Sequence, residues 1–538
     1  MPVSPTYPGV YLTEVTSPVH TITGVPTSIA AFVGPAAQGP VDVATEVNSW
    51  AEFERTFGGL LPGREMSYAV YQFFLNGGAT AQIVRVTGTP VKGSDGKAPA
   101  PAGAAAYQLV QDTSTTPPTT LSLVANSPGT WADNYIVRIE ATKALGPTDP
   151  STGQQPADDT GLPTYNLSVI DPATKVILER YVGISAAGGS QGLLAQLRAS
   201  TIFTVDGDPA LKPVAKDYPR TTKGDDGPDV ILDDLNFTLS ESQQAVLDKV
   251  DIFNMLCIPD AARLTAWTGS GTGSDDALYT SFVSAITTYC HDRRAMFLVD
   301  PPQAWPNSGQ PIESQLVVHD TAIGGNAAFY YPRVSVVDQA GNGLRTLGPS
   351  GTLAGVYAAT DTARGVWKAP AGTAASLTGV VDLDVKLTDK RNGDLNQLGV
   401  NCLRNFPIYG PVSWGARTAN GADQDADQWK YVPVRRTALF IEESLFRGTK
   451  WVVFEPNDEP LWASIRLNVG SFMNGLFRQG AFQGSTPQEA YLVKCDAENN
   501  PQSQIDLGIV NILVGFAPLK PAEFVIINIQ QLTGDLAG

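Results

Sequence analysis

The chain has 538 residues, of which 43% are hydrophobic and 17% charged, and its formal net charge is -17 at pH 7. This length exceeds one ordinary core, so several domains are expected. The acidic balance would repel a phosphate backbone and disfavours nucleic-acid binding. No basic and apolar leader opens the chain and no apolar run of about 18 residues occurs, so we expect a soluble protein without membrane insertion.

The residue types that usually hold metals are sparse. The cysteines and histidines lack the close spacing of a zinc, redox or nucleophile-base site, because they are scattered at Cys257, Cys290, Cys402, Cys495, His20, His291 and His319. We expect buried free thiols and ordinary histidines. The sequence therefore predicts no cofactor and no metal.

The first 21 residues predict an extended N-terminal arm. Pro8 and Pro18 exclude a helix around an alternating segment, which is typical of a strand that pairs within its own domain or with another chain. The side chains expected to make these arm contacts are Val10, Tyr11, Leu12, Thr13 and Val15.

Residues 22–90 predict a compact unit of strands and helices. Ser49 and Glu52 have the spacing of a capping box, and Gly58 is placed to end the first helix. The expected elements are a strand within 24–34, a helix at 48–59, a helix at 66–78 and a strand at 82–88.

Residues 91–235 predict a β-rich insertion. Polar loops beginning at Val91, Ala144 and Asp206 dilute the apolar pattern. Between them we expect antiparallel strands, two of them joined by a turn at Asp171-Pro172, at 121–125, 135–141, 165–171 and 176–182.

Residues 236–345 predict a separate α/β domain, because strands and helices alternate there. The expected order is a helix beginning at Ser240, a strand at 252–260, a helix at 277–290, a strand at 295–302, a helix near 312–323 and a strand at 329–338. Such a βαβ rhythm indicates a mostly parallel sheet.

The last part of the chain, 346–521 followed by an arm at 522–538, predicts two long helices and three strands. The helices are expected at 437–448 and at 460–480, the latter burying Leu461, Ile465, Phe472 and Leu476. Strands are expected at 490–495, 507–516 and 522–532, and the last supplies the arm contacts Phe524, Val525, Ile526, Ile527 and Ile529.

An enzymatic interpretation begins with Asp260 and Asp300, which follow predicted parallel strands, where open α/β sheets often place catalytic groups. Aspartate beside proline also ends strands as a turn former, and that interpretation is the stronger one. Gly448-Thr449-Lys450 lacks the upstream glycine of a phosphate-binding loop. The sequence therefore predicts no catalytic residue.

Several sequence blocks recur in one order along the chain. The first ninety residues contain TYPGVYLTEV, GVPTSIAAFVGPAAQGPV, SWAEFERTFGG and SYAVYQFFLNGGATAQIVRV. Later blocks are SPGTWADN, GPSGTLAGVYAATDTARGVWKAPAG, LNQLGVNCLRNFPIYGPVSWGART and YVPVRRTALFIEESLFRGTKWVVFEPND. In order and spacing these blocks resemble the contractile tail sheath proteins of phages and phage-like injection systems, with a thin match between 91 and 340.

The resemblance implies a multidomain α+β and α/β fold. Residues 22–90 and 346–521 would form the core shared by the family, 91–235 and 236–345 would be inserted domains, and the two arms would link neighbours. Arg435, Arg436 and Arg447 are candidates for charge contacts between subunits, although ion pairs within one subunit explain them equally well.

The resemblance also implies a structural function without catalysis. Subunits would form stacked hexameric rings around an inner tube and contract to drive that tube through an envelope. The implied partners are other copies of the chain, the tube protein, the baseplate and the tail terminator, assembled in a bacterial cytoplasm into a phage tail or injection particle. The alternatives are a non-contractile capsid or fibre subunit and, less favoured, a hydrolase on segment 239–338.

Overall fold

The computed structural model describes residues 20–90, 100–112, 119–142, 164–185, 192–206, 215–235, 246–264, 274–303, 324–341 and 343–529. Three predicted features lie outside these residues, namely the N-terminal arm strand from Val10 to Val15, the helix start at Ser240 and the helix at 312–323. Among the described helices, none has the length and apolar character needed to cross a membrane.

The centre of the protein is an eight-stranded sheet with the order β18-β17-β13-β12-β11-β1-β3-β2. The six strands from β3 to β17 run parallel, and only the outermost strands β2 and β18 are antiparallel to their neighbours. The strands are β1 (Ala30–Gly34), β2 (Thr45–Val47), β3 (Ala81–Arg85), β11 (Met255–Cys257), β12 (Met296–Val299), β13 (Ala327–Tyr331), β17 (Val400–Phe406) and β18 (Gly410–Ser413).

This sheet corrects the prediction of a separate domain at 236–345. Its strands β11, β12 and β13 lie between β1 and β17, so three predicted segments share one sheet. The alternation of strands and helices in this segment was correctly interpreted as a parallel sheet. Pairing such as Ala30 with Met255 joins distant parts of the chain and leaves no local signal.

Alternate residues of the central strands face two different cores, as the period of two along a strand requires. In β12, Met296 and Leu298 belong to one core, whereas Phe297 and Val299 belong to the other. Helices α1 (Trp50–Phe57), α2 (Met66–Leu75) and α7 (Ser350–Arg364) contribute to the first core, and α6 (Ser274–Asp292) contributes to the second. Both faces are covered, as is usual for parallel sheets.

The predicted signals at the ends of α1 are confirmed. Ser49 is the N-cap, and its hydroxyl accepts a hydrogen bond from the Glu52 amide at 3.2 Å. Glu52 in turn accepts from the Asn48 amide, one residue before the cap. Gly58 ends the helix in the left-handed conformation with φ of 86°, which glycine adopts without steric cost.

Helices α2 and α7 pack closely because glycines line their contact. A Cβ added at Gly355 would lie 2.6 Å from the carbonyl oxygen of Phe73 and 2.6 Å from the Cβ of Asn76. A Cβ at Gly351 would lie 2.3 Å from the carbonyl oxygen of Ala69. These distances are far below van der Waals contact, so glycine is required at both positions.

The predicted strand at 329–338 is two strands. It divides at Pro332, which has no N–H to donate and cannot continue the ladder. β13 stays in the central sheet, whereas the residues after the proline join a small sheet of order β15-β14-β16. The strands of this small sheet are β14 (Val334–Val337), β15 (Leu344–Leu347) and β16 (Val380–Leu383), and helix α8 (Asp389–Gln397) follows.

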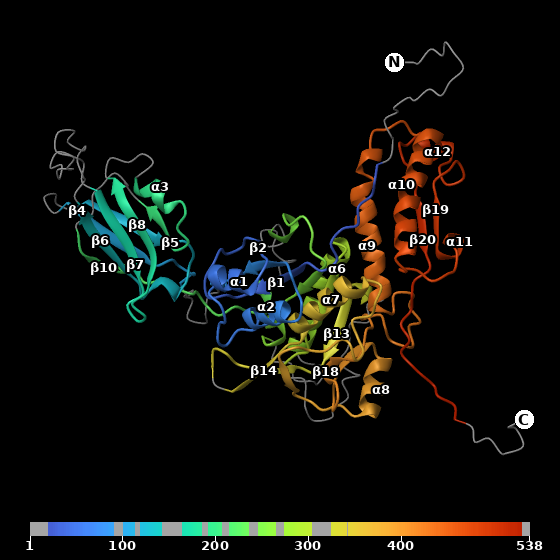
Figure 1. Cartoon of the computed structure of the whole chain (residues 1–538), viewed down its shortest axis with the longest axis horizontal. Helices are drawn as coiled ribbons and strands as arrows, with labels where there is room; N and C mark the ends of the chain where they lie inside the picture. The colour runs from blue at the N-terminus through green and yellow to red at the C-terminus, as the bar shows by residue number, and fades with distance from the viewer. Residues whose placement is uncertain are drawn as a thin grey trace, which may run out of the picture.

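The β-rich insertion forms an outer domain that stands apart from the central sheet in Figure 1. Two antiparallel sheets, β4-β5-β9 and β10-β6-β7-β8, enclose a core of their own. The four predicted strands are confirmed as β5 to β8. The elements are β4 (Ala106–Asp112), β5 (Thr119–Ala125), β6 (Ile136–Thr142), β7 (Thr164–Ile170), β8 (Ile177–Ser185), α3 (Leu193–Leu197), β9 (Phe203–Asp206) and β10 (Asp217–Pro219), with α4 (Leu232–Leu235) on the way back to the body.

A buried arginine forms hydrogen bonds with both the outer domain and the body. The guanidinium of Arg85 donates to the carbonyl oxygens of Ala36 at 3.0 Å, Gly39 at 2.8 Å and Pro128 at 3.0 Å. Pro128 belongs to the outer domain, whereas the other two residues belong to the body. Burial lowers the pKa of Arg85 to about 10, so the side chain stays charged at neutral pH.

The last part of the chain forms a helical hairpin covered by a small sheet (Figure 1). The two predicted helices are confirmed, although α9 begins earlier, at Val432, and Met473 is more deeply buried than Phe472. Strand β20 covers only the end of the predicted 507–516. The elements are α9 (Val432–Gly448), α10 (Glu459–Arg478), α11 (Pro487–Ala490), β19 (Tyr491–Lys494), α12 (Gln502–Ile505) and β20 (Leu513–Phe516).

Candidate assembly surfaces

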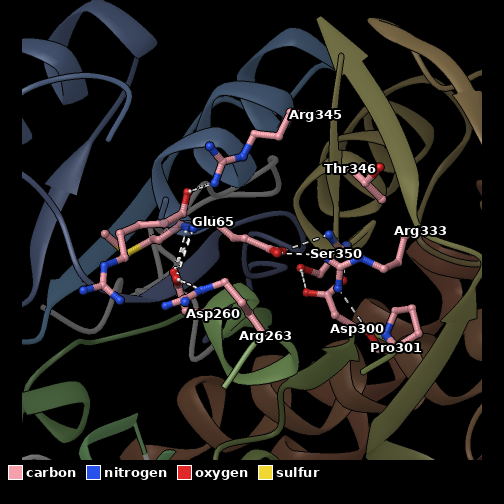
Figure 2. A network of polar contacts seen from close by, with 12 residues as sticks. Glu65, Asp260, Arg263, Asp300, Pro301, Arg333, Arg345, Thr346 and Ser350 are labelled. Atoms are coloured by element: carbon pink, nitrogen blue, oxygen red, sulfur yellow. Dashed lines mark hydrogen bonds and ion pairs between the residues drawn. The ribbon is translucent and has the colours of Figure 1, made fainter. Parts of the chain in front are cut away.

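The two aspartates considered as catalytic groups hold helix ends in place (Figure 2). Asp260 follows β11 and accepts the amides of Glu65 and Met66, the latter at 2.9 Å, at the start of α2. Asp300 follows β12 and accepts the Ser350 amide at 2.7 Å and its hydroxyl at 2.6 Å, at the start of α7. Negative charge is favourable at these helix N-termini.

A buried ion pair completes this network. Arg333, which follows β13, contacts Glu65 at 2.5 Å, and both side chains are about 95% buried. Glu65 also accepts the amide of Gly348 at 3.0 Å, and Arg333 donates to the Pro301 carbonyl (Figure 2). The carboxylates thus serve the packing of two helices on the sheet, which is a structural use of both aspartates.

The Asp300 carboxyl should make stability fall as pH rises. Burial raises its pKa from 3.8 to about 7, so between these values the folded chain holds a proton that the unfolded chain has lost. We expect the free energy of unfolding to fall by about 2 kcal/mol from pH 5.5 to 8 because of this group, and to fall less in Asp300→Asn. Urea denaturation at both pH values measures the difference.

Asp384, whose pKa burial raises to about 6, contributes with the same sign and is present in both proteins. It therefore cancels in the comparison. An identical pH dependence in Asp300→Asn and the parent would show that Asp300 is ionised throughout this range.

All three arginines predicted as charge contacts have partners within the subunit. Arg436 binds Asp361 through two bonds of 2.8 and 2.7 Å. Arg447 contacts Asp251 at 2.7 Å and Glu443 at 2.6 Å. Arg435 donates to Asn326 and Glu442. Of the two roles considered from the sequence, pairing within one subunit is the one that this geometry displays.

The predicted C-terminal arm is an extended segment without a strand partner among the described residues. It begins at Glu523, whose carboxylate takes two bonds of 2.7 Å from the buried Arg417 and one from the Tyr431 hydroxyl. Beyond this anchor the apolar side chains are exposed, with 74% for Phe524, 81% for Val525, 83% for Ile526, 77% for Ile527 and 93% for Ile529. Their contact with another subunit stays a prediction.

The sheet β19-β20 has only two strands in the described subunit, so an edge of each strand is open. The apolar cluster beneath it contains more partly buried than fully buried residues, in contrast to the other three clusters. A groove of about 470 Å³ lies between this sheet, α6 and α9, and its lining is part apolar (Leu445, Phe446, Val469, Ile512 and Val514) and part polar (His291, Asp292, Arg294, Glu442 and Thr449). An isolated two-stranded sheet is marginally stable, so these features fit the addition of strands.

The described chain begins at one end of the helical hairpin, and the C-terminal arm is anchored at the other end (Figure 1). His20, where the described chain begins, stacks on Trp451 just beyond the end of α9, with ring centroids 4.2 Å apart. The C-terminal arm is anchored beside Tyr431, the residue before α9. A helix of this length separates the two points by about 25 Å.

Sequence reasoning missed the anchor of the C-terminal arm. Arg417 and Glu523 lie in different predicted segments, and neither stands in a motif. The available signal was that Glu523 is the lone charged residue in the apolar run AEFVIINI. Among the described residues, no cluster of His, Cys, Asp and Glu could hold a metal ion.

Comparisons with known proteins agree with this architecture. Residues 424–531 match the phage tail sheath C-terminal domain. A stretch of 262 residues, 47% of this chain, is 27% identical to the tail sheath protein of Vibrio phage KVP40, of which it spans 37%.

Two solved structures are similar along nearly the whole chain. The contracted PVC sheath complex, an extracellular contractile injection system, has a TM-score of 0.56 at 21% identity and covers 99% of both chains. A sheath tail protein from Listeria innocua has a TM-score of 0.57 at 13% identity, over 93% of this chain and 97% of that one.

The chain therefore has the fold of these tail sheath proteins. The match of residues 424–531 and the identity to the Vibrio phage protein are similarities to tail sheath proteins that agree with this fold.

Proposed function

We propose that this chain is the structural subunit of a contractile sheath, which polymerises around an inner tube and contracts to drive the tube through a target envelope. The observation that carries the proposal is the run of exposed apolar side chains between 524 and 529, on an arm whose base is bound to the body through Glu523. In a monomer such a segment would be unfavourably exposed. In a polymer it would be buried.

The arm is suited to β-augmentation, in which an extended segment adds a strand to an open sheet edge. The open edges of β19 and β20 are the acceptor with the right chemistry, because apolar residues already line one side of that sheet. Burying the five apolar side chains would contribute on the order of 5 to 10 kcal/mol per arm before the entropic cost of ordering it.

Linkage through arms also suits contraction. Because the described chain begins at one end of the helical hairpin and the C-terminal arm is anchored at the other, one subunit could join neighbours on two sides (Figure 1). The apolar side chains from Phe524 to Ile529 are largely exposed, so subunits could rotate relative to each other while their strands stay paired. The energy of contraction would come from burying further surface, with no nucleotide hydrolysis.

The proposed partners follow from the similarity to tail sheath proteins. Other copies of the chain form the sheath, a tube protein fills it, and baseplate and terminator proteins close its ends. One neighbour with a similar fold is a subunit of the anti-feeding prophage baseplate structure, with a TM-score of 0.52. We place assembly in the cytoplasm of a bacterial host, before release of a phage tail or injection particle.

Electron microscopy of the purified full chain tests the proposal, alongside versions lacking residues 1–20 or 522–538. Regular hollow tubes from the full chain alone are expected, with circular dichroism showing that all three proteins are folded. Closed shells or straight solid fibres would favour a non-contractile structural subunit. Dispersed particles from the full chain, even with tube and baseplate proteins added, would contradict sheath assembly.

A further inference from the structure

The loop between α9 and α10 exposes an aromatic side chain in a strained conformation. The Phe454 side chain is fully exposed to solvent, and its backbone has φ of 71°. A left-handed backbone is unusual for a bulky residue and costs on the order of 1 kcal/mol or more. The preceding Val453 is also 63% exposed. The loop therefore holds an apolar tip out in solvent at an energetic cost.

Acidic residues follow this tip along the loop. Glu455 and Asp458 are exposed on the same loop, and Glu459 begins α10. Asp458 caps α10 through the Leu461 amide, and Glu459 pairs with Arg466. Glu455 has neither role. The loop thus offers an aromatic ring flanked by negative charge, and its complement would be an aromatic or apolar cavity with positive charge.

A groove with that chemistry lies elsewhere on the same chain. It has a volume of about 1110 Å³ and runs along the base of the C-terminal arm. Its aromatic walls are Trp367, Phe406 and Trp414, and its cations include Arg364, Lys368 and Lys520.

Among the described residues no carboxylate pairs with Arg364, Lys368 or Lys520, because the two carboxylates that line the groove bind other arginines. Asp389 pairs with Arg404 at 2.7 Å, and Glu523 pairs with Arg417. Lys368 donates only to the Ala369 carbonyl. Burial, and then the neighbouring Arg364, lower its pKa, so an incoming carboxylate would relieve repulsion between these two cations.

The loop and the groove lie at opposite ends of the helical hairpin. The loop joins the end of α9 to the start of α10, whereas the groove is lined by Tyr431, just before α9, and by Gln479, just after α10. The hairpin is about 25 to 30 Å long. The loop therefore cannot reach the groove of its own chain. Complementary surfaces at opposite ends are the arrangement of a head-to-tail contact, which forms a closed ring or an open filament according to the rotation between copies.

We propose that Phe454 and its acidic loop insert into the aromatic, cationic groove of a second copy of this chain, joining copies head to tail. The inference rests on the proposed sheath function and adds to it a contact between subunit bodies. The ring would lie among Trp367, Phe406 and Trp414, with Glu455 near Arg364 and Lys368. The arm base forms one wall of the groove, so this contact and the arm linkage would meet at one place.

Disulfide trapping tests this contact directly, because the four native cysteines are buried. One variant carries Val453→Cys, which leaves the Phe454 ring in place, and a second carries Ala371→Cys in the groove. We expect a disulfide-linked dimer when the two variants are mixed under mild oxidation, and at least tenfold less in either variant alone. A dimer of Val453→Cys with itself would overturn the head-to-tail arrangement.

Assembly measurements supply the second test. Phe454→Ala should raise the concentration needed for tube formation by about tenfold or more, as loss of an aromatic anchor does, whereas Val182→Ala on the outer domain should not. Glu455→Lys should act in the same direction, and Lys368→Glu in the same chain should restore assembly. Normal tubes from Phe454→Ala without a mixed dimer would overturn this inference and leave the sheath function standing. Failure of the parent chain to assemble would contradict both.

Discussion

Replacing Ile526 by proline should leave the subunit folded and stop it from polymerising. Ile526 lies in the middle of the exposed apolar arm and is 83% exposed, so the substitution disturbs nothing within the described subunit. Proline removes the backbone N–H and fixes φ, and an edge strand tolerates it only where that N–H would face solvent. We expect the N–H of residue 526 to face the neighbour's strand, so that proline interrupts the added ladder at its centre. Sedimentation and electron microscopy measure the loss of tubes.

The matched control for this substitution is Ile526→Val, which keeps the N–H and a β-branched side chain and should polymerise normally. Thermal unfolding should be the same for both variants and the parent. If Ile526→Pro formed tubes at the parent's concentration, the arm would not act as a strand, and the proposal of β-augmentation would be wrong.

A single methyl group at Gly355 should destabilise the body by roughly 2 to 4 kcal/mol, because overpacking a rigid contact forces the backbone to shift. The new Cβ would meet the Phe73 carbonyl oxygen and the Asn76 Cβ at 2.6 Å, and the first of these is backbone that cannot rotate away. Chemical denaturation of Gly355→Ala against the parent measures the effect.

Gly470 provides the control for Gly355. It also lies within a helix, α10, but an added Cβ there would meet nothing within 4 Å. Alanine has the higher helix propensity, so Gly470→Ala should be unchanged or up to about 1 kcal/mol more stable. Equal stability of Gly355→Ala and the parent would mean that α2 and α7 can separate freely.

The local elements of the fold were predictable because their signals are local. The capping residue Ser49 and the stop at Gly58 gave the limits of α1, and alternating residues gave the strands of the outer domain. The order of the central sheet was not predictable, since it depends on pairs such as Ala30 with Met255. Nothing near either residue indicates its partner.

The candidate assembly surfaces, too, were predictable only where their signals are local in the sequence. An apolar run after two prolines identified the C-terminal arm, and the structure shows those side chains exposed. The anchor between Arg417 and Glu523 joins residues 106 positions apart and was missed. Phe454 was also missed, because an exposed phenylalanine and a buried one look the same in a sequence. Only the left-handed backbone and the full exposure distinguish it.

The contact between Arg85 of the body and Pro128 of the outer domain bears on how outer domains can differ between proteins of this fold. Every group that Arg85 binds is a main-chain carbonyl, including the one contributed by Pro128 of the outer domain. Because this contact uses a main-chain carbonyl, it constrains few side chains of the outer domain. The outer domain could therefore be exchanged for one of different sequence with little change in the body, provided that the entering chain presents this carbonyl and an acceptor for the Gly39 amide, which now bonds to the Ser127 hydroxyl. The body would keep its assembly chemistry while its outer surface changed.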